Sequence, residues 1–294
     1  MRILLTGATG FLGQAVLAAA PPEFAFLTLG RRPPPVARRG LVHIEADLSS
    51  PGSLLSALEG IGSAVDIVIH LAVSRLHRGF PDSALDMFNV NVASTAHLLD
   101  FARRAGARQF ILGSTGTVYH PFKNPICRED DILEPQSYFG FSKLAAERFA
   151  LTYSSSHFDV FVPRFFSPYG PGQEDRLISG LIDNVGNGRP VRLPPHGDGL
   201  SIAPLYLDDA VRVLLAAAAE RWRGVVNVAG PQVLTLSEMA RIVGRVSGRK
   251  PVFERVAGVL DAALVADLGR LSRHMPLDSF VGFEEGLARF VTRQ

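Results

Sequence analysis

The sequence predicts an α/β protein: a doubly wound parallel sheet, with a smaller region formed mostly by the C-terminal part of the chain. Two patterns support this prediction. Continuous apolar stretches of strand length, typical of strands buried on both faces, alternate with helical stretches up to Arg164. Beyond Arg164, proline and glycine crowd residues 168–172 and 186–199, and the alternation loosens.

The elements of the first half follow one another in strand–helix order. We expect strands at Ile3–Leu5, Phe24–Leu29, Leu41–Ile44, Asp66–Leu71, Gln109–Gly113 and Asp159–Pro163. We expect helices at Phe11–Ala20, Pro51–Gly60, Asp82–Ala105 and Ser137–Ser154. Short right-handed crossovers between such strands give a doubly wound sheet. The three consecutive prolines within residues 31–39 predict a loop.

The second half mixes shorter elements. Helices are expected at Leu177–Gly188, Asp208–Glu220, Leu236–Gly248 and Phe283–Thr292, and strands at Leu205–Leu207 and Val225–Val228. We interpret these pieces as a small cap over the carboxyl edge of the sheet. Open α/β sheets bind their ligands in a crevice at that edge.

The first thirteen residues indicate what the sheet binds. The first strand runs directly into Gly7-x-x-Gly10-x-x-Gly13, and an apolar helical pattern follows. Gly7 permits a tight turn, Gly10 lets the backbone approach phosphates, and Gly13 lets the helix pack closely on the strand. The helix N-terminus adds free N–H groups and a partial positive charge. This context predicts a Rossmann-type pyrophosphate site; an ordinary glycine-rich turn is the alternative.

Composition narrows the class of protein. A hydrophobic content of 47%, a charged content of 20% and a net charge of +2 are those of an ordinary globular protein. Nothing in this balance suggests a nucleic-acid or membrane partner, and no metal site is predicted. The single cysteine, Cys127, excludes an internal disulfide, and no apolar run approaches a membrane span. We therefore expect a cytoplasmic protein.

The end of the second strand bears on the choice of dinucleotide. The strand ends in Leu29-Gly30-Arg31-Arg32, without the acidic residue that usually binds the ribose hydroxyls of NAD. Arg31 and Arg32 suit a 2′-phosphate, which favours NADP over NAD, although solvated loop charges are the alternative. Asp47 and Leu48, after the third strand, fit a contact with the adenine amino group, or the start of the next helix.

Longer motifs resemble a known family. They are Thr6-Gly-Ala-Thr-Gly-Phe-Leu-Gly13, Asp47-Leu48, His70-Leu71-Ala72, Asn91-Val-x-x-Thr95, Gly113-Ser-Thr-Gly-Thr-Val-Tyr119, Ser142-Lys143-Leu-Ala-Ala-Glu147, Arg164-x-x-x-x-Tyr169-Gly-Pro171 and Tyr206-x-Asp208-Asp209-Ala210. Together they resemble the extended short-chain dehydrogenase/reductase family, of the nucleotide-sugar epimerase/dehydratase type. The resemblance covers nearly the whole chain.

The resemblance implies that different parts of the chain bind the cofactor and the substrate. Residues 1–166 with 203–229 would bind the dinucleotide, and residues 167–202 with 230–294 would form the substrate-binding cap. The implied cofactor contacts are Gly7, Thr9, Gly10, Phe11, Leu12, Gly13, Arg31, Arg32, Asp47, Leu48, Leu71, Ala72, Asn91, Lys143, Pro163 and Phe166. The implied substrate contacts are Ser74, Thr115, Ser167, Arg176 and Arg192. Relatives also imply a homodimer, joined through the helices around 82–105 and 137–154.

The family's catalytic pair is incomplete in this chain. Relatives carry Tyr-x-x-x-Lys on one helix, in which the lysine and the oxidised nicotinamide lower the phenol pKa for proton transfer. Here the lysine is Lys143, but Phe139 stands four residues before it. An engineered substitution and a natural protein with another acid, or none, are both open. Tyr138 is the weakest substitute, because a neighbouring helix residue points about 100° away.

Other positions match the family more closely or depart from it. Thr115 aligns with the hydroxyl that holds the reacting substrate oxygen, and a turn-capping threonine is the alternative. Ser167 replaces the asparagine usual in sugar-nucleotide members, and residues 201–204 lack the usual arginine. Arg176, Arg192 and Arg255 are candidates to bind a pyrophosphate, or are exposed cap arginines.

The sequence thus predicts an NADP- or NAD-dependent oxidoreductase or epimerase that acts on a nucleotide sugar by hydride transfer. Reduction and 4-epimerisation are the expected reactions. Two alternatives remain open: a non-catalytic dinucleotide-binding sensor or scaffold, and a reductase of a small carbonyl compound without a nucleotide.

Overall fold

The computed structural model describes residues 1–62, 64–76, 78–120, 125–154, 156–174 and 176–291. The chain forms two compact units. The first comprises Met1–Val118, Leu133–Arg164 and Val211–Val226, and the second comprises Tyr119–Ile132, Phe165–Ala210 and Asn227–Gln294. The assignment of dinucleotide and substrate binding to separate stretches of chain stays a prediction.

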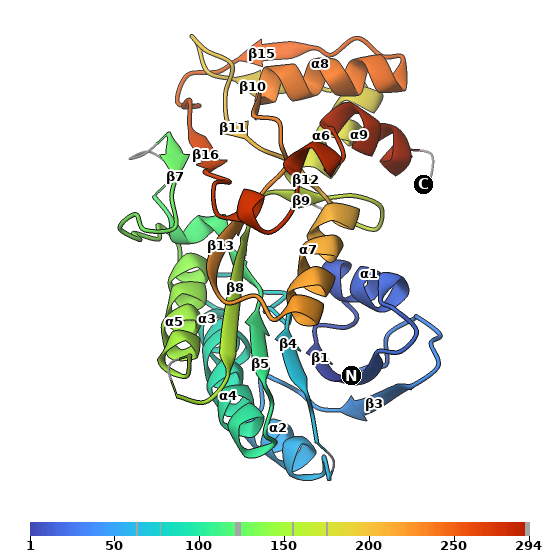
Figure 1. Ribbon diagram of the computed structural model, residues 1–294. Coiled ribbons are helices and arrows are strands. Elements are labelled where there is room, and N and C mark those ends of the chain that lie inside the picture. Colours follow the sequence, from blue (N-terminus) through green and yellow to red (C-terminus); the bar gives the residue numbers. More distant parts are fainter. Residues whose placement is uncertain (63, 77, 121–124, 155, 175, 292–294) are drawn as a thin grey trace. The chain divides into compact units, whose positions relative to one another are not determined.

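The predicted doubly wound sheet is confirmed (Figure 1). The strands follow the order β13-β8-β5-β4-β1-β2-β3, and short β6 pairs with β8. Their bounds are β1 Arg2–Thr6, β2 Ala25–Gly30, β3 Leu41–Glu45, β4 Ile67–His70, β5 Gln109–Leu112, β6 Ser114–Thr115, β8 Asp159–Phe165 and β13 Gly224–Val228. The pairs that join β3, β2, β1, β4, β5 and β8 are all parallel. The strand order reverses direction beside β1, where such sheets bind their ligands.

Helices cover both faces of this sheet in the first unit (Figure 1). Helices α2 (Pro51–Glu59), α4 (Ser94–Arg104) and α5 (Tyr138–Thr152) share one apolar core with inward-facing strand residues such as Leu4 and Val68. Helix α1 (Phe11–Ala19) and most of α7 (Leu207–Glu220) lie on the other face. The apolar strands predicted from the sequence are buried on both sides for this reason.

The glycine turn after β1 has no room for side chains. Gly7 has a φ of +73°, and a Cβ there would come within 2.6 Å of the backbone nitrogen of Ala72. A Cβ at Gly13 would collide with the carbonyl oxygen of Gly7. The turn therefore packs on residues 71–72 after β4 only because Gly7 lacks a side chain, and α1 packs on the turn only because Gly13 does.

The single helix expected over residues 82–105 is broken, so this part of the prediction is wrong. Helix α3 (Ala84–Phe88) passes through a π-turn at Asn89–Ala93 before α4 begins. Hydroxyl groups compete for the backbone carbonyls here: Ser94 donates to Val90 at 2.6 Å, and Thr95 donates to Asn91 at 2.8 Å. Such side-chain bonds loosen regular helical hydrogen bonding. The π-turn, a feature common at functional sites, leaves Asn91 fully buried.

The second unit is built from short elements around its own core. Its helices are α6 (Leu177–Gly186), α8 (Leu236–Ser247) and α9 (Phe283–Val291). Its strands are β7 Ile126–Cys127, β9 Pro168–Tyr169, β10 Val191–Leu193, β11 Ser201–Ile202, β12 Leu205–Tyr206, β14 Leu234–Thr235, β15 Phe253–Arg255 and β16 Ala263–Ala266. They form one sheet, β14-β11-β16-β7, and two strand pairs, β10-β15 and β12-β9.

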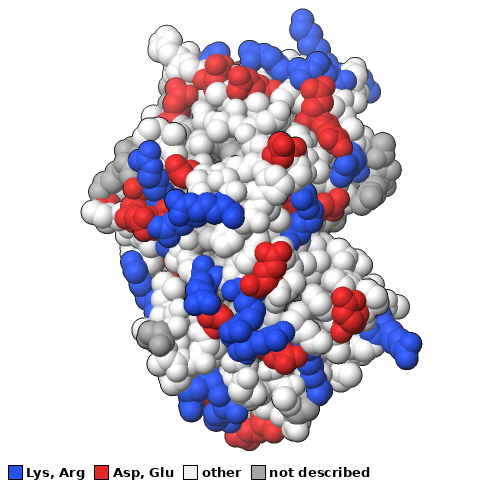
Figure 2. Space-filling model, in the orientation of Figure 1, with Lys and Arg blue, Asp and Glu red and all other residues white. Residues whose placement is uncertain are grey.

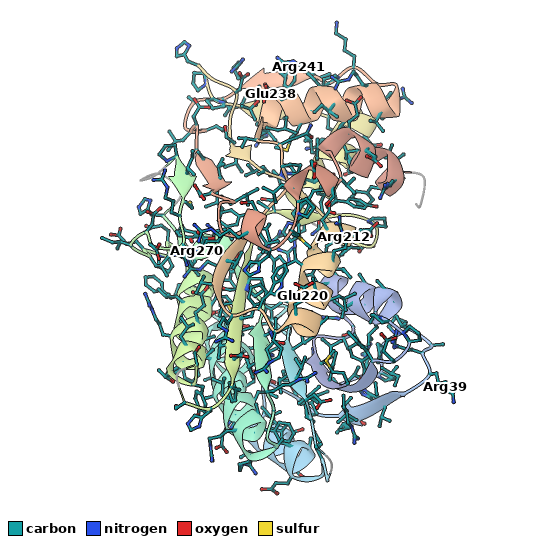
Figure 3. All side chains as sticks on the ribbon, in the orientation of Figure 1. Arg39, Arg212, Glu220, Glu238, Arg241 and Arg270 are labelled. Carbon is teal, nitrogen blue, oxygen red and sulfur yellow. The ribbon has the colours of Figure 1, made fainter. Side chains whose placement is uncertain are left out.

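Helix α8 shows how this unit is held together. Thr235 and Glu238 form a capping box at its start, and Gly248, with a φ of 66°, ends it. The guanidinium of Arg241, which Figure 3 labels on this helix, lies 5.4 Å from the ring centroid of Phe253. Within the described residues, the structure has no helix long and apolar enough to cross a membrane.

The glycine turn yields a stability prediction. Gly13→Ala is expected to lower the free energy of unfolding by about 2 kcal/mol, because the added methyl overpacks the turn, and to weaken dinucleotide binding. Gly52→Ala is the matched control, since Gly52 lies in α2 with open space around it. That variant should gain about 0.5–1 kcal/mol. Urea unfolding measures both, and equal effects of the two substitutions would contradict the packing argument.

Candidate functional site

The glycine turn is the base of the candidate site in the first unit. The turn is closed by a hydrogen bond from the Gly10 N–H to the Gly7 carbonyl at 2.9 Å. Gln14 donates to the Thr9 carbonyl at 2.9 Å, which fixes the loop from inside α1. Residue 10 is the N-cap of α1 and, being glycine, has no side chain to cap the first N–H groups. Those groups suit an anionic ligand.

Leu71 and Ala72 lie directly against this turn. Both contribute the backbone atoms that leave no room at Gly7. They extend the end of β4, which the sequence assigns to the cofactor. The structure therefore brings the predicted cofactor residues of the glycine turn together with Leu71 and Ala72.

The predicted adenosine contacts lie at the ends of β2 and β3. Arg31 and Arg32 are both exposed. The Asp47 carboxylate accepts hydrogen bonds from the Ser49 N–H at 2.9 Å and the Ser49 hydroxyl at 2.8 Å. Burial raises the pKa of Asp47, but the Ser49 hydrogen bonds and nearby Arg31 outweigh it and lower the pKa overall. Asp47 is therefore an anion beside Arg31, whether or not it also contacts adenine.

The reacting group predicted at the carboxyl edge is Thr115. It ends β6, which follows directly on β5. Its Oγ1 lies 3.1 Å from that of Thr117 and accepts a hydrogen bond from the Thr117 N–H at 3.2 Å. The threonine therefore closes the next turn, as the alternative interpretation expects, and its contact with a substrate oxygen stays a prediction.

Helix α5 brings position 139 to the same place. Ser137 caps the helix by accepting the Gly140 N–H at 3.1 Å, so Phe139 lies in the first turn and is half-buried. A Cβ at Gly140 would come within 2.7 Å of the Thr117 carbonyl oxygen. The helix start thus packs directly on the segment that carries Thr115. Tyr138 instead stacks its ring on Phe80, with 5.2 Å between centroids.

Lys143 follows one turn later and is 4% exposed. Burial lowers the pKa of its ammonium to about 8, and the Glu147 carboxylate partly offsets this. His70, fully buried at the end of β4, has its pKa lowered to about 3 by burial and by Lys143. The imidazole is therefore neutral near pH 7, hydrogen-bonded to Thr6 Oγ1 at 2.6 Å, and acts in packing.

A buried ion pair fixes α5 against the sheet. Arg164 Nη2 of β8 lies 2.7 Å from Glu147 Oε2, with side chains 3% and 1% exposed. The Ser114 hydroxyl donates to the other carboxylate oxygen of Glu147. One carboxylate thus joins α5, β8 and β6. The sequence motifs contain Glu147 and Arg164, but sequence reasoning did not predict that they pair. The signal for such a pair is a charged residue of opposite sign on each of two elements that are otherwise apolar.

A second buried chain of hydrogen bonds supports the helix start. Asn91 donates to Ser142 Oγ at 2.9 Å, and Ser142 donates to the Phe139 carbonyl at 2.8 Å. Asn91 Oδ1 accepts the Ser74 N–H at 3.0 Å. Ser74, predicted to touch substrate, is 1% exposed and its hydroxyl donates to Asp86. In this conformation it supports Asn91 through its backbone.

The remaining predicted residues are divided between the units. Pro163 is buried in β8 of the first unit. In the second, Phe166 is buried with its ring 5.9 Å from that of Tyr119, and Ser167 adopts a φ of 44°. Arg176 is the exposed N-cap of α6, and Arg192 is exposed with its Nε 3.4 Å from Glu254 Oε2. Arg255 donates to the carbonyls of Pro194 and Gly197.

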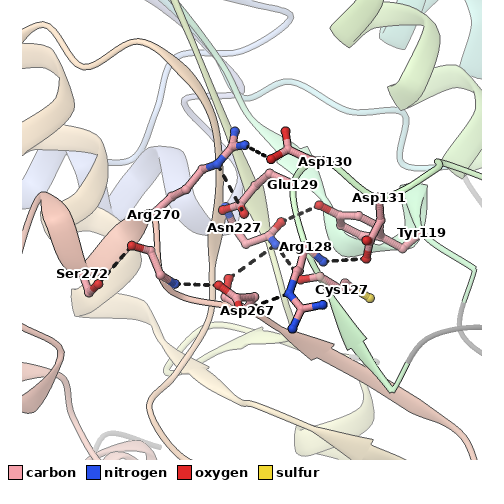
Figure 4. A network of polar contacts seen from close by, with 11 residues as sticks. Tyr119, Cys127, Arg128, Glu129, Asp130, Asp131, Asn227, Asp267, Arg270 and Ser272 are labelled. Atoms are coloured by element: carbon pink, nitrogen blue, oxygen red, sulfur yellow. Dashed lines mark hydrogen bonds and ion pairs between the residues drawn. The ribbon is translucent and has the colours of Figure 1, made fainter.

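Sequence reasoning also missed a polar network in the second unit (Figure 4). Asn227 is buried at its centre: it accepts the Tyr119 hydroxyl at 2.9 Å and donates to the Cys127 carbonyl at 2.9 Å. Its backbone N–H donates to Glu129 at 2.8 Å, and Arg270 lies 3.7 Å from the same carboxylate. The network fastens the segment that follows Thr115 and Thr117 in the chain.

Charges elsewhere are mixed. Figure 2 shows Lys and Arg interspersed with Asp and Glu over the face it presents, in keeping with the net charge of +2. Among the residues that the structure describes, no group of three or more His, Cys, Asp and Glu side chains is arranged to hold a metal ion.

Comparison with known proteins supports the same interpretation. Residues 3–229 match the model of the "NAD dependent epimerase/dehydratase family". The chain is 30% identical to a dTDP-glucose 4,6-dehydratase of Streptomyces griseus, over 99% of this chain and 93% of that protein. The structure of MoeE5 in complex with UDP-glucuronic acid and NAD is 27% identical, with a TM-score of 0.84 over 100% of this chain and 98% of that one.

A further solved structure shares the fold at lower identity. It is a tyrosine-to-phenylalanine mutant of UDP-glucuronic acid 4-epimerase from Bacillus cereus, in complex with a 4-deoxy-4-fluoro UDP-sugar and NAD. It is 22% identical, with a TM-score of 0.84 over 100% of this chain and 98% of that chain. With the glycine turn, the sheet order and the match over residues 3–229 all in agreement, the chain belongs to the NAD-dependent epimerase/dehydratase family, a branch of the extended short-chain dehydrogenases/reductases.

Proposed function

We propose that the chain binds a nicotinamide dinucleotide and a nucleotide sugar, and that it moves a hydride between them in reduction or 4-epimerisation. The observation that carries the proposal is the crowded glycine turn, where Gly7 lies against Ala72 without room for a Cβ and opens onto α1. The dinucleotide would supply the hydride acceptor or donor. The relatives, which include a dTDP-glucose 4,6-dehydratase and MoeE5 in complex with UDP-glucuronic acid, support the substrate class.

The chain's own residues would act at the carboxyl edge of the first unit. Thr115 would hold the substrate oxygen. Its Oγ1 accepts the Thr117 N–H, and its hydroxyl can donate to a substrate oxygen when Thr117 acts as the donor in the bond between the two hydroxyls. Lys143 would bind the nicotinamide ribose through its ammonium. The Glu147 carboxylate, one turn along α5, favours the charged form of this lysine against the effect of burial. Phe139 would occupy the place of the family's tyrosine and cannot carry a proton.

The choice between NAD and NADP belongs to the same proposal. The relatives' structures contain NAD, which supports NAD as a cofactor here, whereas the sequence favours NADP through Arg31 and Arg32. Both arginine side chains are exposed, so neither is part of the hydrophobic core. We propose that they add affinity for a 2′-phosphate without excluding NAD.

The arginine pair gives a direct prediction. Arg31→Ala combined with Arg32→Ala is expected to weaken NADP binding at least about tenfold, because a charge-assisted contact to the phosphate is lost. NAD binding should change less than about threefold. Calorimetric titration with each dinucleotide measures this. Arg39→Ala, an exposed arginine in the same loop, is the control, and parallel losses for NAD and NADP would count against a 2′-phosphate site.

Restoring the phenol tests the role of position 139. Phe139→Tyr is expected to raise turnover about 10² to 10⁴-fold, the usual contribution of a positioned acid–base group. The assay uses NAD or NADP with dTDP-glucose, UDP-glucose and UDP-glucuronic acid, and follows NADH absorbance and sugar products. Phe149→Tyr, farther along the same helix and exposed, should leave the rate unchanged. No gain on any of these sugars that binds would reject the assignment.

Phe139 also favours a second candidate function, a dinucleotide-binding sensor or scaffold without turnover. The mutant epimerase with phenylalanine in place of tyrosine is in complex with NAD and a nucleotide sugar, which supports binding of both ligands by a chain that has phenylalanine at such a position. The test measures the melting temperature of the chain with nucleotide sugars and with simple ketones and aldehydes. A ligand that binds the native state raises the melting temperature. A shift with simple carbonyls alone would point to a small-carbonyl reductase.

The exposed side chains of α3 and α5 suit a homodimer. These helices contact each other, and four of their large apolar side chains are exposed: Leu85, Phe88, Phe141 and Phe149. Monomeric proteins rarely expose such contiguous apolar surface. We propose that a second copy of the chain covers it through a two-fold axis, which pairs the same helices from each copy.

A charge in this surface should dissociate the dimer. The Phe141 side chain is 58% exposed. We expect Phe141→Asp to change the molar mass, measured by light scattering after size exclusion, from that of a dimer to that of a monomer. Leu260→Asp alters a comparably exposed apolar residue outside α3 and α5 and should remain dimeric. A monomeric wild-type chain at micromolar concentration would refute the proposed interface.

A further inference from the structure

The pair of threonines at the carboxyl edge has a geometry that the family motif does not explain. Thr117 Oγ1 lies 3.1 Å from Thr115 Oγ1, within hydrogen-bond distance. The Thr117 N–H also donates to Thr115 Oγ1 at 3.2 Å. Thr115 is half-buried, whereas Thr117 is exposed. The two hydroxyls therefore form a short path from the inner position to solvent.

The hydrogen bonds leave Thr115 one donor and one acceptor position for this path. Thr115 Oγ1 accepts the backbone N–H, so its remaining capacity is one O–H to donate and one lone pair to accept. A substrate hydroxyl on one side and Thr117 on the other satisfy both. Neutral hydroxyls linked in this way can exchange protons in either direction along the chain of hydrogen bonds.

The path begins where the family's phenol is absent. Gly140 follows Phe139 in α5 and lies against the Thr117 carbonyl, where a Cβ would come within 2.7 Å of the oxygen. The start of α5, one residue after Phe139, therefore packs on the segment that carries Thr117. Phe139 offers no proton donor or acceptor there, and Tyr138 is stacked on Phe80.

We propose that Thr117 is a positioning residue that passes the proton between Thr115 and solvent, in place of the tyrosine hydroxyl. This inference rests on the proposed function. It would allow a chain with phenylalanine at position 139 to turn over, at a rate below that of a tyrosine enzyme.

The step balances in the oxidative direction. The C–H bond of the substrate alcohol breaks, and its hydride passes to the oxidised nicotinamide dinucleotide. The O–H bond breaks, and the proton bonds to Thr115 Oγ1 while the Thr115 proton moves to Thr117 and the Thr117 proton moves to water. The products are a carbonyl, the reduced dinucleotide and one proton in solution. Reduction runs through the same atoms in reverse.

The test compares Thr117→Val in two backgrounds of the full-length chain. With Phe139 present, the variant should lower kcat by about 10 to 100-fold with little change in KM, and Thr117→Ser should recover most of the rate. With Phe139→Tyr present, Thr117→Val should cost less than about threefold, because the phenol carries the proton. Thr152→Val, an exposed threonine at the end of α5, is the matched control.

The outcomes separate this inference from the proposed function. UDP-glucose, UDP-glucuronic acid and dTDP-glucose are the probes, with melting temperatures confirming that each variant is folded. Equal losses in both backgrounds, or none in either, overturn the relay while leaving the proposed function intact. Wild-type binding of dinucleotide and sugar without turnover also overturns the relay. Absence of dinucleotide binding overturns the proposed function itself. The solvent deuterium kinetic isotope effect on kcat is a further readout. A larger effect in the wild-type chain than in Phe139→Tyr supports the relay.

Discussion

The buried ion pair between Arg164 and Glu147 is the interaction on which the candidate site depends. Two charges removed from water are stable only when geometry and further hydrogen bonds compensate for lost hydration. Here the guanidinium fork and the Ser114 hydroxyl supply that compensation. The same carboxylate raises the pKa of Lys143 against the effect of burial. The Glu147 carboxylate of α5 therefore holds that helix against strand β8, through Arg164, and against the strand that carries Thr115, through Ser114.

Much of the fold could be predicted because its determinants are local. Apolar strands and the glycine turn specify the sheet, since burial on both faces and the lack of side chains at Gly7 and Gly13 follow from residue type alone. The break in the helix after Phe88 could not be predicted in this way. It depends on whether Ser94 and Thr95 turn their hydroxyls toward the backbone, which a hydrophobic pattern does not record. The short strands of the second unit carry too few residues for a periodic signal.

The candidate site was predictable only in part, for similar reasons. Lys143, Thr115 and Phe139 stand in motifs with fixed spacing. Thr117 lies in a short turn, and its significance comes from its distance to Thr115 and from the missing Cβ of Gly140. Ser74 shows what a motif does not record: its predicted substrate contact stays a prediction, and in the structure its hydroxyl donates to Asp86. Arg192 likewise has an acidic neighbour, Glu254.

Asn227 has a consequence for how this family member can diverge. Its side-chain amide donates to the main-chain carbonyl of Cys127, so that bond makes no demand on the identity of the residue there. The bond to the Asp267 carbonyl, at 3.5 Å, is of the same kind. Neighbouring positions can therefore drift in sequence while the attachment persists, whereas Asn227 itself tolerates little change. Within residues 125–132, a position that meets Asn227 only through its main chain is therefore open to substitution, whereas Glu129, whose carboxylate accepts the Asn227 N–H, is not.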